Sequence, residues 1–427
     1  MLARIAPLAV LIGLAACSGG DTTETPAPTP APAKAKQKAP APAEAKAPEG
    51  PVPTIMISQA WFKKTGGKMQ PQPAKMVLYR MADDGSWHEE IILDPDSNVF
   101  HKAMAWRDGI LTIGAMKAMI KHWTRGDDGT WTAETLWEQS WGGKFDRFRD
   151  VEFTDLDGDG KDEMCLATHD MGVVAVGKEG DDGKWTFTEL DKTPDIFVHE
   201  VEVGDLEGDG KMEFYVTPSE RNKSSGVSQP GGVARYQAKK DGTFGGGKIV
   251  WWEESHAKEI LVTDADGDGK DELYVVKEGH VVKEGGKKVL KDPVTLVRMD
   301  KDGKDWKETV VATIPGEKQT RFVVPGDVDK DGAVEIVAAG METGVHVLQP
   351  KGDGTFEVQT IEENSGGFEH ATHVADLDKD GTLEIYVAAD KQRQLRKYVW
   401  NGTRFERTKI ADLPRDHITW NVQDGVF

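Results

Sequence analysis

One acidic pattern, D-x-[DE]-x-D-G-x-x-E, occurs five times in this chain of 427 residues. Carboxylates at alternate positions of a tight loop converge on one point, the glycine allows the turn, and the ninth residue closes the cage. Ca²⁺ takes about six to eight oxygen ligands and is the usual occupant of such a loop. The predicted metal ligands are Asp155, Asp157, Asp159 and Glu163; Asp205, Glu207, Asp209 and Glu213; Asp264, Asp266, Asp268 and Glu272; Asp327, Asp329, Asp331 and Glu335; and Asp376, Asp378, Asp380 and Glu384.

The residues around these loops distinguish between two kinds of calcium site. An EF-hand places its loop between helices and needs a glutamate at position twelve. This chain has Leu166 at that position in the first copy and Val216 in the second. The flanking residues, such as 383–388, alternate or are apolar and β-branched, which is typical of strands. The sequence therefore predicts strand–loop–strand units and excludes an EF-hand.

The repeat length predicts the architecture. The acidic loops recur at intervals of 50, 59, 63 and 49 residues, a period that is typical of a β-propeller or a similar array. Asp-Gly and Asn-Gly favour hairpin turns because they tolerate positive φ. We therefore predict an all-β fold, a seven-bladed β-propeller with metal loops in five blades, in which an aromatic residue after each turn packs on the outer strand. Such turns begin at Asp84, Asp128, Asp182, Asp241, Asp302, Asp353 and Asn401.

Two of the predicted blades lack a metal loop. Residues 97–141 have a short turn at Asp108 instead, and residues 415–427 resemble an inner strand that ends early. Residues 53–96 supply the later strands of a blade without an inner one. We expect the C-terminal strand to complete that blade and to close a propeller domain at residues 53–427.

The N-terminal residues predict export and anchoring. Residues 1–17 contain one arginine, an apolar core and the ending Leu-Ala-Ala-Cys, which predicts a signal peptide rather than a membrane span. The ending resembles the lipobox of bacterial lipoproteins and implies a lipid on Cys17; an ordinary secretory signal cut near Ala16 is the alternative. Residues 18–52 are rich in Ala and Pro and predict a disordered tether. The resemblance implies a lipid-anchored protein of the bacterial cell envelope, at the outer membrane and facing the periplasm or the cell surface.

Composition limits the classes of partner. The formal net charge is −20, which equals the charge of the loop carboxylates, so the acidity is largely a signature of the metal sites and nucleic acid is excluded as a partner. Cys165 lies in an apolar segment and is expected to be a buried thiol. With Cys17 lipidated, no disulfide is available, and the metal loops are the main cross-links expected of a monomeric domain.

These motifs resemble the FG-GAP/VCBS repeat family, whose propellers include the head of integrin alpha-subunits and many bacterial surface proteins. The acidic pattern matches in five blades, with glutamate where the family often has aspartate at position nine. The likeness covers residues 53–427 and implies a calcium-binding propeller. It does not fix an activity, because the family includes binding proteins and lyases alike.

A basic residue stands six positions before the first aspartate of every acidic loop, near the start of each predicted inner strand. The two blades without a loop have a histidine seven positions before their Asp-Gly aspartate. Inner strands line the axis of a propeller, so we predict a ligand-binding ring at the channel end opposite the metal loops. An alternative is that each member pairs with a neighbouring acid such as Asp150 or Glu369. The predicted ring consists of His101, Arg149, His199, Lys258, Arg321, His370 and His417.

The chemistry of this ring leaves several functions open. Imidazoles are ligands of transition metals, so the axial histidines offer a second kind of metal site. Some seven-bladed polysaccharide lyases are similar in having axial His and Arg, which would supply a base and cations for β-elimination of an acidic sugar. The chain has no G-x-S-x-G, H-E-x-x-H or phosphate-loop motif. The catalytic residues of an enzyme therefore stay unassigned.

The leading functional hypothesis is a calcium-stabilised envelope lipoprotein that binds an anionic glycan or a protein partner at the axial face. A polysaccharide lyase-like enzyme and a purely structural envelope protein are the alternatives. An open axial pocket with converging basic side chains favours a binding or catalytic role. Side chains splayed outward in salt bridges favour the structural role.

Overall fold

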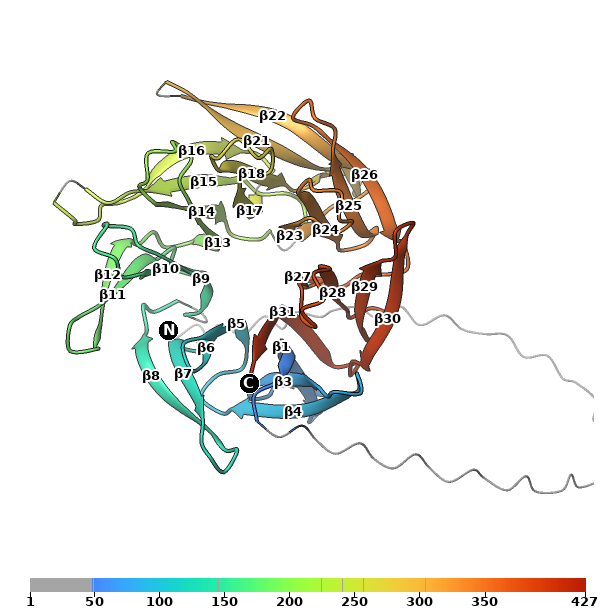
Figure 1. The fold of residues 1–427 in the computed structure, drawn as a ribbon. Coiled ribbons are helices and arrows are strands. Elements are labelled where there is room, and N and C mark those ends of the chain that lie inside the picture. The colour runs from blue at the N-terminus through green and yellow to red at the C-terminus, as the bar shows by residue number, and fades with distance from the viewer. Residues whose placement is uncertain are drawn as a thin grey trace, which may run out of the picture. The chain divides into compact units, whose positions relative to one another are not determined.

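The computed structural model describes residues 48, 50–143, 146–223, 225–239, 241–255, 257–303 and 305–427. The predicted signal peptide, the lipidation site at Cys17 and nearly all of the predicted tether lie outside the described residues. The described residues form eight antiparallel sheets, and seven of these are arranged as blades around a central axis (Figure 1). The predicted all-β, seven-bladed propeller is confirmed. No helix that is long and apolar enough to cross a membrane occurs in the described part of the chain.

Each blade has an inner strand at the axis, followed outward by a second strand. The inner strands are β5 (Phe100–Trp106), β9 (Phe148–Thr154), β13 (Ile196–Gly204), β17 (Ala257–Thr263), β23 (Thr320–Gly326), β27 (Thr372–Ala375) and β31 (His417–Val426). The second strands are β1 (Pro53–Thr65), β6 (Gly109–Gly114), β10 (Glu163–Thr168), β14 (Glu213–Glu220), β18 (Glu272–Lys277), β24 (Glu335–Gly340) and β28 (Glu384–Ala389).

A third and an outer strand complete each blade. The third strands are β3 (Ala74–Met81), β7 (Ala118–Arg125), β11 (Val174–Glu179), β15 (Gly231–Tyr236), β21 (Val294–Asp302), β25 (Gly344–Pro350) and β29 (Gln394–Trp400). The outer strands are β4 (Trp87–Asp94), β8 (Trp131–Gln139), β12 (Trp185–Asp191), β16 (Lys248–Glu253), β22 (Asp305–Ile314), β26 (Phe356–Glu362) and β30 (Phe405–Asp412).

The outer hairpin of every blade is built on the Asp-Gly or Asn-Gly turn that the sequence predicts. In the turn between β3 and β4, Gly85 has a φ of 77°, and Asp84 Oδ1 accepts the N–H of Ser86 at 2.9 Å. This left-handed conformation suits glycine and matches the twist of a hairpin. The aromatic residue after each turn packs into a different hydrophobic cluster, as predicted: Trp87, Trp131, Trp185, Phe244, Trp306, Phe356 and Phe405.

The hydrophobic core lies between adjacent blades. In the described residues, each of seven clusters combines side chains of two neighbouring sheets. For example, Val337 of β24 packs in one cluster with Ile385 and Tyr398 of the next blade. Both faces of a sheet are therefore buried, which explains the continuous apolar runs of β10 and β28. Each buried Val, Ile or Leu contributes about 1.5–3 kcal/mol to the free energy of unfolding.

The first blade joins the two ends of the described chain. β31 pairs antiparallel with β1, from His417 opposite Trp61 to Val426 opposite Pro53. It is thus the inner strand of the sheet that β1, β3 and β4 continue. Each inner strand also contacts the inner strands of both neighbouring blades. The ring is therefore closed by strands that lie more than three hundred residues apart in the sequence.

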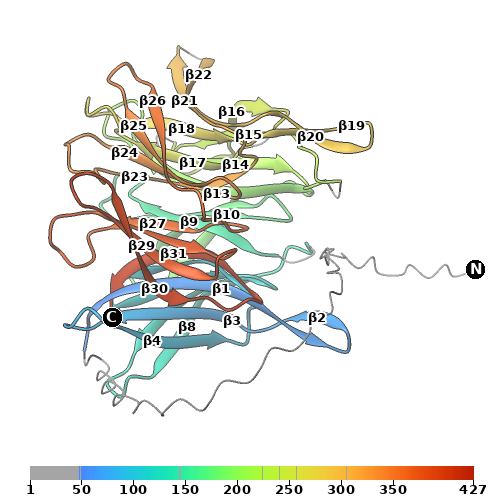
Figure 2. The same cartoon turned by 90° about the vertical axis from the view of Figure 1, so that its right-hand side faces the viewer.

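Two hairpins extend beyond the blades. β1 continues past its sheet and pairs with β2 (Lys68–Pro71), and a hairpin of β19 (His280–Glu284) and β20 (Lys287–Asp292) is inserted between β18 and β21. Figure 2 shows β2 and the β19–β20 hairpin on the same side of the propeller. This is the side where the inner strands begin, whereas the acidic loops follow the ends of those strands. We did not predict either hairpin from the sequence.

Cys165 of β10 confirms one further sequence prediction. It is a free, fully buried thiol, and burial raises the pKa of that thiol well above its usual value. A neutral buried thiol packs as a small apolar side chain.

Candidate functional site

Four of the five acidic loops gather their carboxylates into groups that could hold a metal ion. In each group the ligand atoms lie within 4.8 Å of one another. No other group of this kind occurs in the described residues. The groups are Asp155, Asp157 and Glu163; Asp264, Asp266, Asp268 and Glu272; Asp327, Asp329 and Glu335; and Asp376, Asp378 and Glu384.

Hydrogen bonds to the backbone hold the first and last acid of each loop. Asp155 accepts the N–H groups of Gly158 at 2.8 Å and Gly160 at 2.9 Å. Glu163, at the start of β10, accepts the N–H of Leu156 at 2.9 Å. The same glutamate contact recurs in the loops of Glu272, Glu335 and Glu384. The spacing of the motif therefore positions these carboxylates through local geometry alone.

Buried oxygen atoms in these loops indicate where a cation would lie. Asp157 Oδ1, Asp327 Oδ1, Glu335 Oε1 and Asp376 Oδ1 are buried and accept no hydrogen bond. Burial raises the pKa of Glu335 to about 7, with a further contribution from the neighbouring aspartates. Clustered carboxylates with unused oxygens are the donor set that a hard cation requires. The residues of these four loops therefore fit a metal ion.

A guanidinium lies among the carboxylates of the Asp205 loop. Lysines also lie in two of the other loops: Lys178 pairs with Asp157, Asp159 and Glu163, and Lys397 pairs with Glu384 at 3.1 Å. Arg235 of β15 forms ion pairs with Glu207 at 2.6 Å and with both oxygens of Glu213. Lys301 also pairs with Glu207. These cations neutralise the carboxylates and take the oxygens that a metal ion needs. The oxygen atoms of this loop do not gather as they do in the four groups above, so the fifth metal site stays a prediction.

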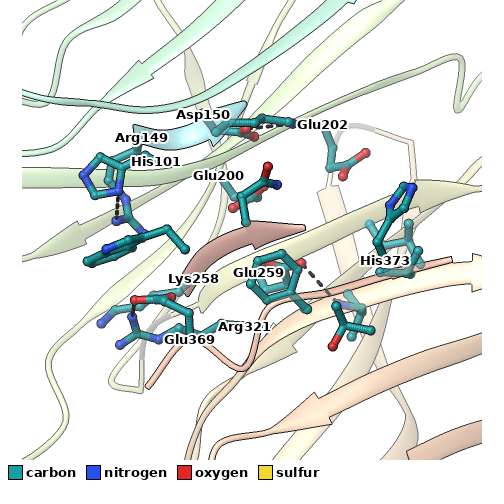
Figure 3. A pocket seen from close by; sticks show the side chains of 18 of the residues that line it. His101, Arg149, Asp150, Glu200, Glu202, Lys258, Glu259, Arg321, Glu369 and His373 are labelled. Atoms are coloured by element: carbon teal, nitrogen blue, oxygen red, sulfur yellow. Dashed lines mark hydrogen bonds and ion pairs between the residues drawn. The ribbon is translucent and has the colours of Figure 1, made fainter. Parts of the chain in front are cut away.

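A second candidate site is a cavity of about 330 Å³ on the propeller axis (Figure 3). Four members of the predicted ring line it: His101, Arg149, Lys258 and Arg321. Each lies where the pairing of its inner strand with the second strand shifts register. A β-bulge at such a point redirects a side chain. Local bulges thus turn these four residues towards the axis.

Two other predicted ring members are held away from the cavity. His370 has a φ of 58°, and its buried ring contacts the carbonyl of Gly340 at 2.7 Å and Ser365 Oγ at 2.8 Å. His417 lies at the start of β31 and stacks on Trp61, with ring centroids 5.6 Å apart. The prediction that these two residues belong to the axial ring is therefore wrong.

His199 also does not line the cavity, although its strand has a register shift there. Its ring is buried, contacts Ser219 Oγ at 3.2 Å and packs edge-on against Phe197. The same bulge directs the next residue, Glu200, to the axis instead. The axial histidines do not form a group of three or more metal ligands in the described residues, so the geometry offers no support for a transition-metal site.

Burial keeps the axial histidines neutral. It lowers the pKa of His101 well below its usual value, and Arg149 lowers it further. Burial also lowers the pKa of His370 and that of His417 to about 4. These imidazoles therefore add no positive charge near pH 7, contrary to what the sequence led us to expect of the ring.

Sequence reasoning missed two aromatic residues at the mouth of the cavity. Trp420 is the bulge residue of β31 and lines the cavity, and its ring lies 6.0 Å from that of Phe368. The guanidinium of Arg149 is 5.3 Å from the Trp420 ring, and that of Arg321 is 4.8 Å from the Phe368 ring. Both distances are in the range of cation–π contacts. We chose His417 from the sequence by counting seven positions back from the C-terminal Asp-Gly pair. That count did not allow for the bulge at Trp420.

The cavity has a basic mouth and an acidic interior. The four basic ring residues stand at the beginning of the inner strands. Arg321 lies beside Glu369 (Figure 3), with Nη1 2.5 Å from Oε1, so the alternative of pairing with a neighbouring acid holds for Arg321. The residues that follow along these strands, and so lie deeper, are mainly acidic. Lys102 is the counterion among them, with Nζ 2.8 Å from Asp150. The acidic residues that line the interior are Asp150, Glu152, Glu200, Glu202 and Glu259.

Lys258 is an axial cation whose charge changes near neutral pH. Its side chain is 5% exposed, and Nζ lies 3.3 Å from Asn222 Oδ1. Burial, together with repulsion from Arg321, lowers the pKa of Lys258 to about 7. A perturbed pKa in a cavity is a common property of functional residues.

The fold and the acidic loops define the class of this protein as a β-propeller with metal-loop repeats. The family model described as "FG-GAP-like repeat" matches residues 155–216, 264–338 and 327–387. The chain therefore contains FG-GAP-like repeats within a seven-bladed β-propeller. No curated protein matches it by sequence.

Solved structures show the same fold at low sequence identity. A lectin of Agrocybe aegerita that recognises non-reducing terminal N-acetylglucosamine is 13% identical, with a TM-score of 0.53 over 86% of this chain and 94% of that chain. A protein from Lactobacillus plantarum is 12% identical, with a TM-score of 0.56 over 87% and 99%. A putative 6-phosphogluconolactonase from Bacteroides uniformis is 13% identical, with a TM-score of 0.53 over 87% and 99%. At this identity the likeness concerns the fold alone.

Proposed function

We propose that this protein is a calcium-stabilised binding module of the bacterial cell envelope, whose basic axial mouth takes an anionic glycan. One observation carries the proposal: Arg149, Lys258 and Arg321 converge on one cavity beside two aromatic rings. Guanidinium groups match the geometry of carboxylates. Aromatic rings offer an apolar surface to the carbon face of a sugar ring.

The basic residues lie at the mouth of the cavity and the acidic residues lie deeper. This arrangement supports a ligand site at the mouth rather than along the whole channel. The acidic interior, with Glu200, Glu202 and Glu259, offers little attraction to an anion, because its lysine, Lys102, already pairs with Asp150 and Glu152. Burial raises the pKa of all three carboxyl groups well above their usual value, and Lys102 offsets part of the remaining charge. An anionic ligand is therefore expected to stop at the level of Arg149 and Arg321.

Calcium is the ion that the loop ligands favour. The four groups offer carboxylate oxygens and no imidazole or thiolate, and such ligands suit hard cations rather than zinc or copper. When bound, the ion would cross-link an inner strand to the second strand of its blade. Extracellular calcium sites have dissociation constants of about 10⁻⁴–10⁻³ M, which fits a protein outside the cytoplasm.

Attachment to the membrane by a lipid on Cys17 is part of the proposal. It is supported by the apolar segment and the Leu-Ala-Ala-Cys ending, and by the composition of residues 18–52, which suits a tether. A protein partner that presents carboxylates at the axial mouth is the alternative ligand. Metabolic labelling with a fatty acid, compared between the wild type and Cys17→Ala, tests the anchor.

Isothermal titration with a galacturonate oligosaccharide and with a neutral oligosaccharide of equal length tests the site. We expect binding of the acidic sugar only, and weakening by added salt. Each charged hydrogen bond is worth about 1.5–3 kcal/mol, so Arg149→Ala and Arg321→Ala should each weaken binding about tenfold or more. Arg404→Ala, on the exposed turn before β30, is the control. Equal binding of the neutral sugar would contradict the proposal.

A second candidate function, an acidic-sugar lyase, is favoured by Lys258. A neutral amine there could take the proton next to the sugar carboxylate while the guanidinium groups stabilise the resulting charge. The bond to the leaving sugar oxygen then breaks, a double bond forms in the ring, and the oxygen leaves as a hydroxyl group after taking a proton from water. Ultraviolet absorbance of the unsaturated product detects this reaction. Loss of product in Lys258→Met, with binding retained, would support the lyase; no product in the wild type would exclude it.

A further inference from the structure

We propose that the ligand is a linear acidic oligosaccharide, which continues from the axial mouth into a second cleft beneath the β19–β20 hairpin. This inference rests on the proposed function and extends it from a single anionic group to a chain of them. The site then consists of the axial mouth and the hairpin cleft, which is defined by the residues below.

The hairpin cleft is a cavity of about 440 Å³ that adjoins the axial cavity, since Lys258 and Arg321 line both. Its walls come from the segment between β14 and β15, from the β19–β20 hairpin and from the start of β23. Hydrogen bonds hold the hairpin in place: the N–H of Ser228 donates to the carbonyl of Val281, and the N–H of Val281 to Ser228 Oγ, both at 2.9 Å. The hairpin is therefore a fixed wall of the cleft.

Positive charge continues along this cleft. Its lining has five basic side chains and two carboxylates, although the chain as a whole has a net charge of −20. Lys318 pairs with one of these carboxylates, Glu342, at 2.9 Å. Lys288 reaches across from the hairpin, since a methyl group on Gly226 would collide with its Nζ. The five basic residues are Lys223, Lys258, Lys288, Lys318 and Arg321.

A series of cations that extends away from the mouth fits a ligand with several anionic groups. A single anion can be satisfied by Arg149, Lys258 and Arg321 alone. Cavities of about 300–1,000 Å³ each accommodate a molecule of drug size, so the two adjoining cavities together exceed the needs of one sugar. The cations of the hairpin cleft would then meet successive carboxylates of a chain.

Two features favour a saccharide over an acidic peptide. Apolar side chains alternate with the cations: Phe368 is 47% exposed, and Leu290 lines the same cleft. Sugar rings combine an apolar face with a charged rim. A peptide would gain most from an open strand edge, but the backbone here is already paired, as in the hydrogen bond from Gly279 N–H to the carbonyl of Lys318 at 2.9 Å.

Titration of the full-length protein with galacturonate monomer and with tetragalacturonate tests this inference. We expect Lys223→Ala combined with Lys288→Ala to weaken binding of the tetramer about tenfold, because two exposed cations are lost. The same variant should bind the monomer as the wild type does. Arg321→Ala should weaken binding of both. Lys409→Ala, on the exposed outer strand β30, is the matched control, and melting curves establish that the variants are folded.

The possible outcomes distinguish failure of this inference from failure of the proposed function. Equal affinity of the wild type for monomer and tetramer, with no effect of the lysine changes, overturns the extended site and leaves the axial site intact. Absence of binding by either sugar overturns both. Tighter binding of tetraglutamate than of tetragalacturonate, lost in the same variants, would show that the cleft takes an acidic peptide and would overturn the saccharide assignment.

Discussion

Lys258 is the residue whose surroundings bear most directly on the chemistry of the axial mouth. Burial favours its neutral form, as does the neighbouring Arg321, whereas Glu278 and Glu369 favour the charged form. Arg149 and Arg321 stay charged at any pH that the fold survives. The axial mouth therefore combines two permanent cations with one whose charge changes near neutral pH.

The affinity for an acidic sugar should rise several-fold as pH falls from about 8.5 to 6. Lys258 gains a proton as the pH passes its pKa of about 7, and the added charge attracts the carboxylate. Burial lowers the pKa of His101 well below its usual value and holds that of His370 and His417 near 4, so these three histidines do not contribute. Titrations at several pH values measure this effect.

Two variants of Lys258 separate its charge from its shape. Lys258→Met should bind weakly at every pH in that range. Lys258→Arg should bind at pH 8.5 about as well as the wild type does at pH 6, because its charge is permanent. A pH dependence that persists in Lys258→Met would show that another group titrates.

His370 should make the folded protein sensitive to acid. Burial depresses its pKa from 6.5 to about 4, so the unfolded chain binds a proton more readily than the folded chain does. The stabilisation is complete above pH 6.5 and is lost as pH falls towards 4, by up to about 3 kcal/mol. His370→Asn keeps a residue that tolerates positive φ and should flatten this dependence. Denaturant unfolding at saturating calcium measures it; identical pH profiles would contradict the assignment.

At the scale of single elements, small departures from a regular strand decide where side chains point. The extra residue of the bulge in β5, β9 and β17 is the basic one that faces the axis. In β31 the extra residue is Trp420, and before β27 the chain turns through His370 instead. A fixed count from the acidic loop therefore selects the right residue only where the bulge recurs.

We expect the loop of Asp205 to behave differently from the others, because Arg235 holds both oxygens of Glu213. We expect four calcium ions per chain from equilibrium dialysis of the wild type. In Arg235→Met, Glu213 would be buried without a counterion, and a fifth ion should bind. Arg298→Met is the control, since Arg298 pairs with Asp300 at 2.7 Å rather than with a loop. Five ions in the wild type would refute the role given to Arg235.

Removal of calcium should lower stability sharply, because the clustered carboxylates of each loop then repel one another. Sites with dissociation constants of about 10⁻⁴–10⁻³ M each add about 1 kcal/mol at millimolar calcium, so four sites contribute about 4 kcal/mol. Thermal melts with calcium and with EDTA measure the difference. A melting temperature that EDTA leaves unchanged would show that the loops do not bind calcium.

At the scale of the whole molecule, the propeller depends on closure between its ends. Every blade is buried on both faces by its neighbours, so an opened ring would expose apolar surface at two blades. The pairing of β1 with β31 prevents this. Strand β31 therefore holds the ring of blades closed.

Deletion of residues 415–427 should cause aggregation. It removes the inner strand of the first blade and leaves β1 with an unpaired edge, and such edges invite pairing with other chains. Size-exclusion chromatography with light scattering measures the outcome. A truncated protein that stays monomeric with the same melting temperature would refute the importance of closure.

The amino-acid sequence by itself determined the all-β class, the seven blades, the hairpin turns and the carboxylates of the acidic loops. These features depend on residues a few positions apart, so that local spacing and the conformational freedom of Asp-Gly turns suffice to predict them. The closure by residues 415–427 follows from the same counting, since one blade lacked an inner strand.

Only the tertiary structure decided which side chains share the axial cavity. His199, His370 and His417 match the spacing of the predicted ring but lie elsewhere. His199 lies at a bulge that directs Glu200 to the axis, His370 has a positive φ, and His417 stacks on Trp61. Arg235 enters an acidic loop from another strand, and the hairpin cleft joins three segments that are distant in the sequence. Such contacts depend on packing between strands and blades, for which a single sequence carries no local signal.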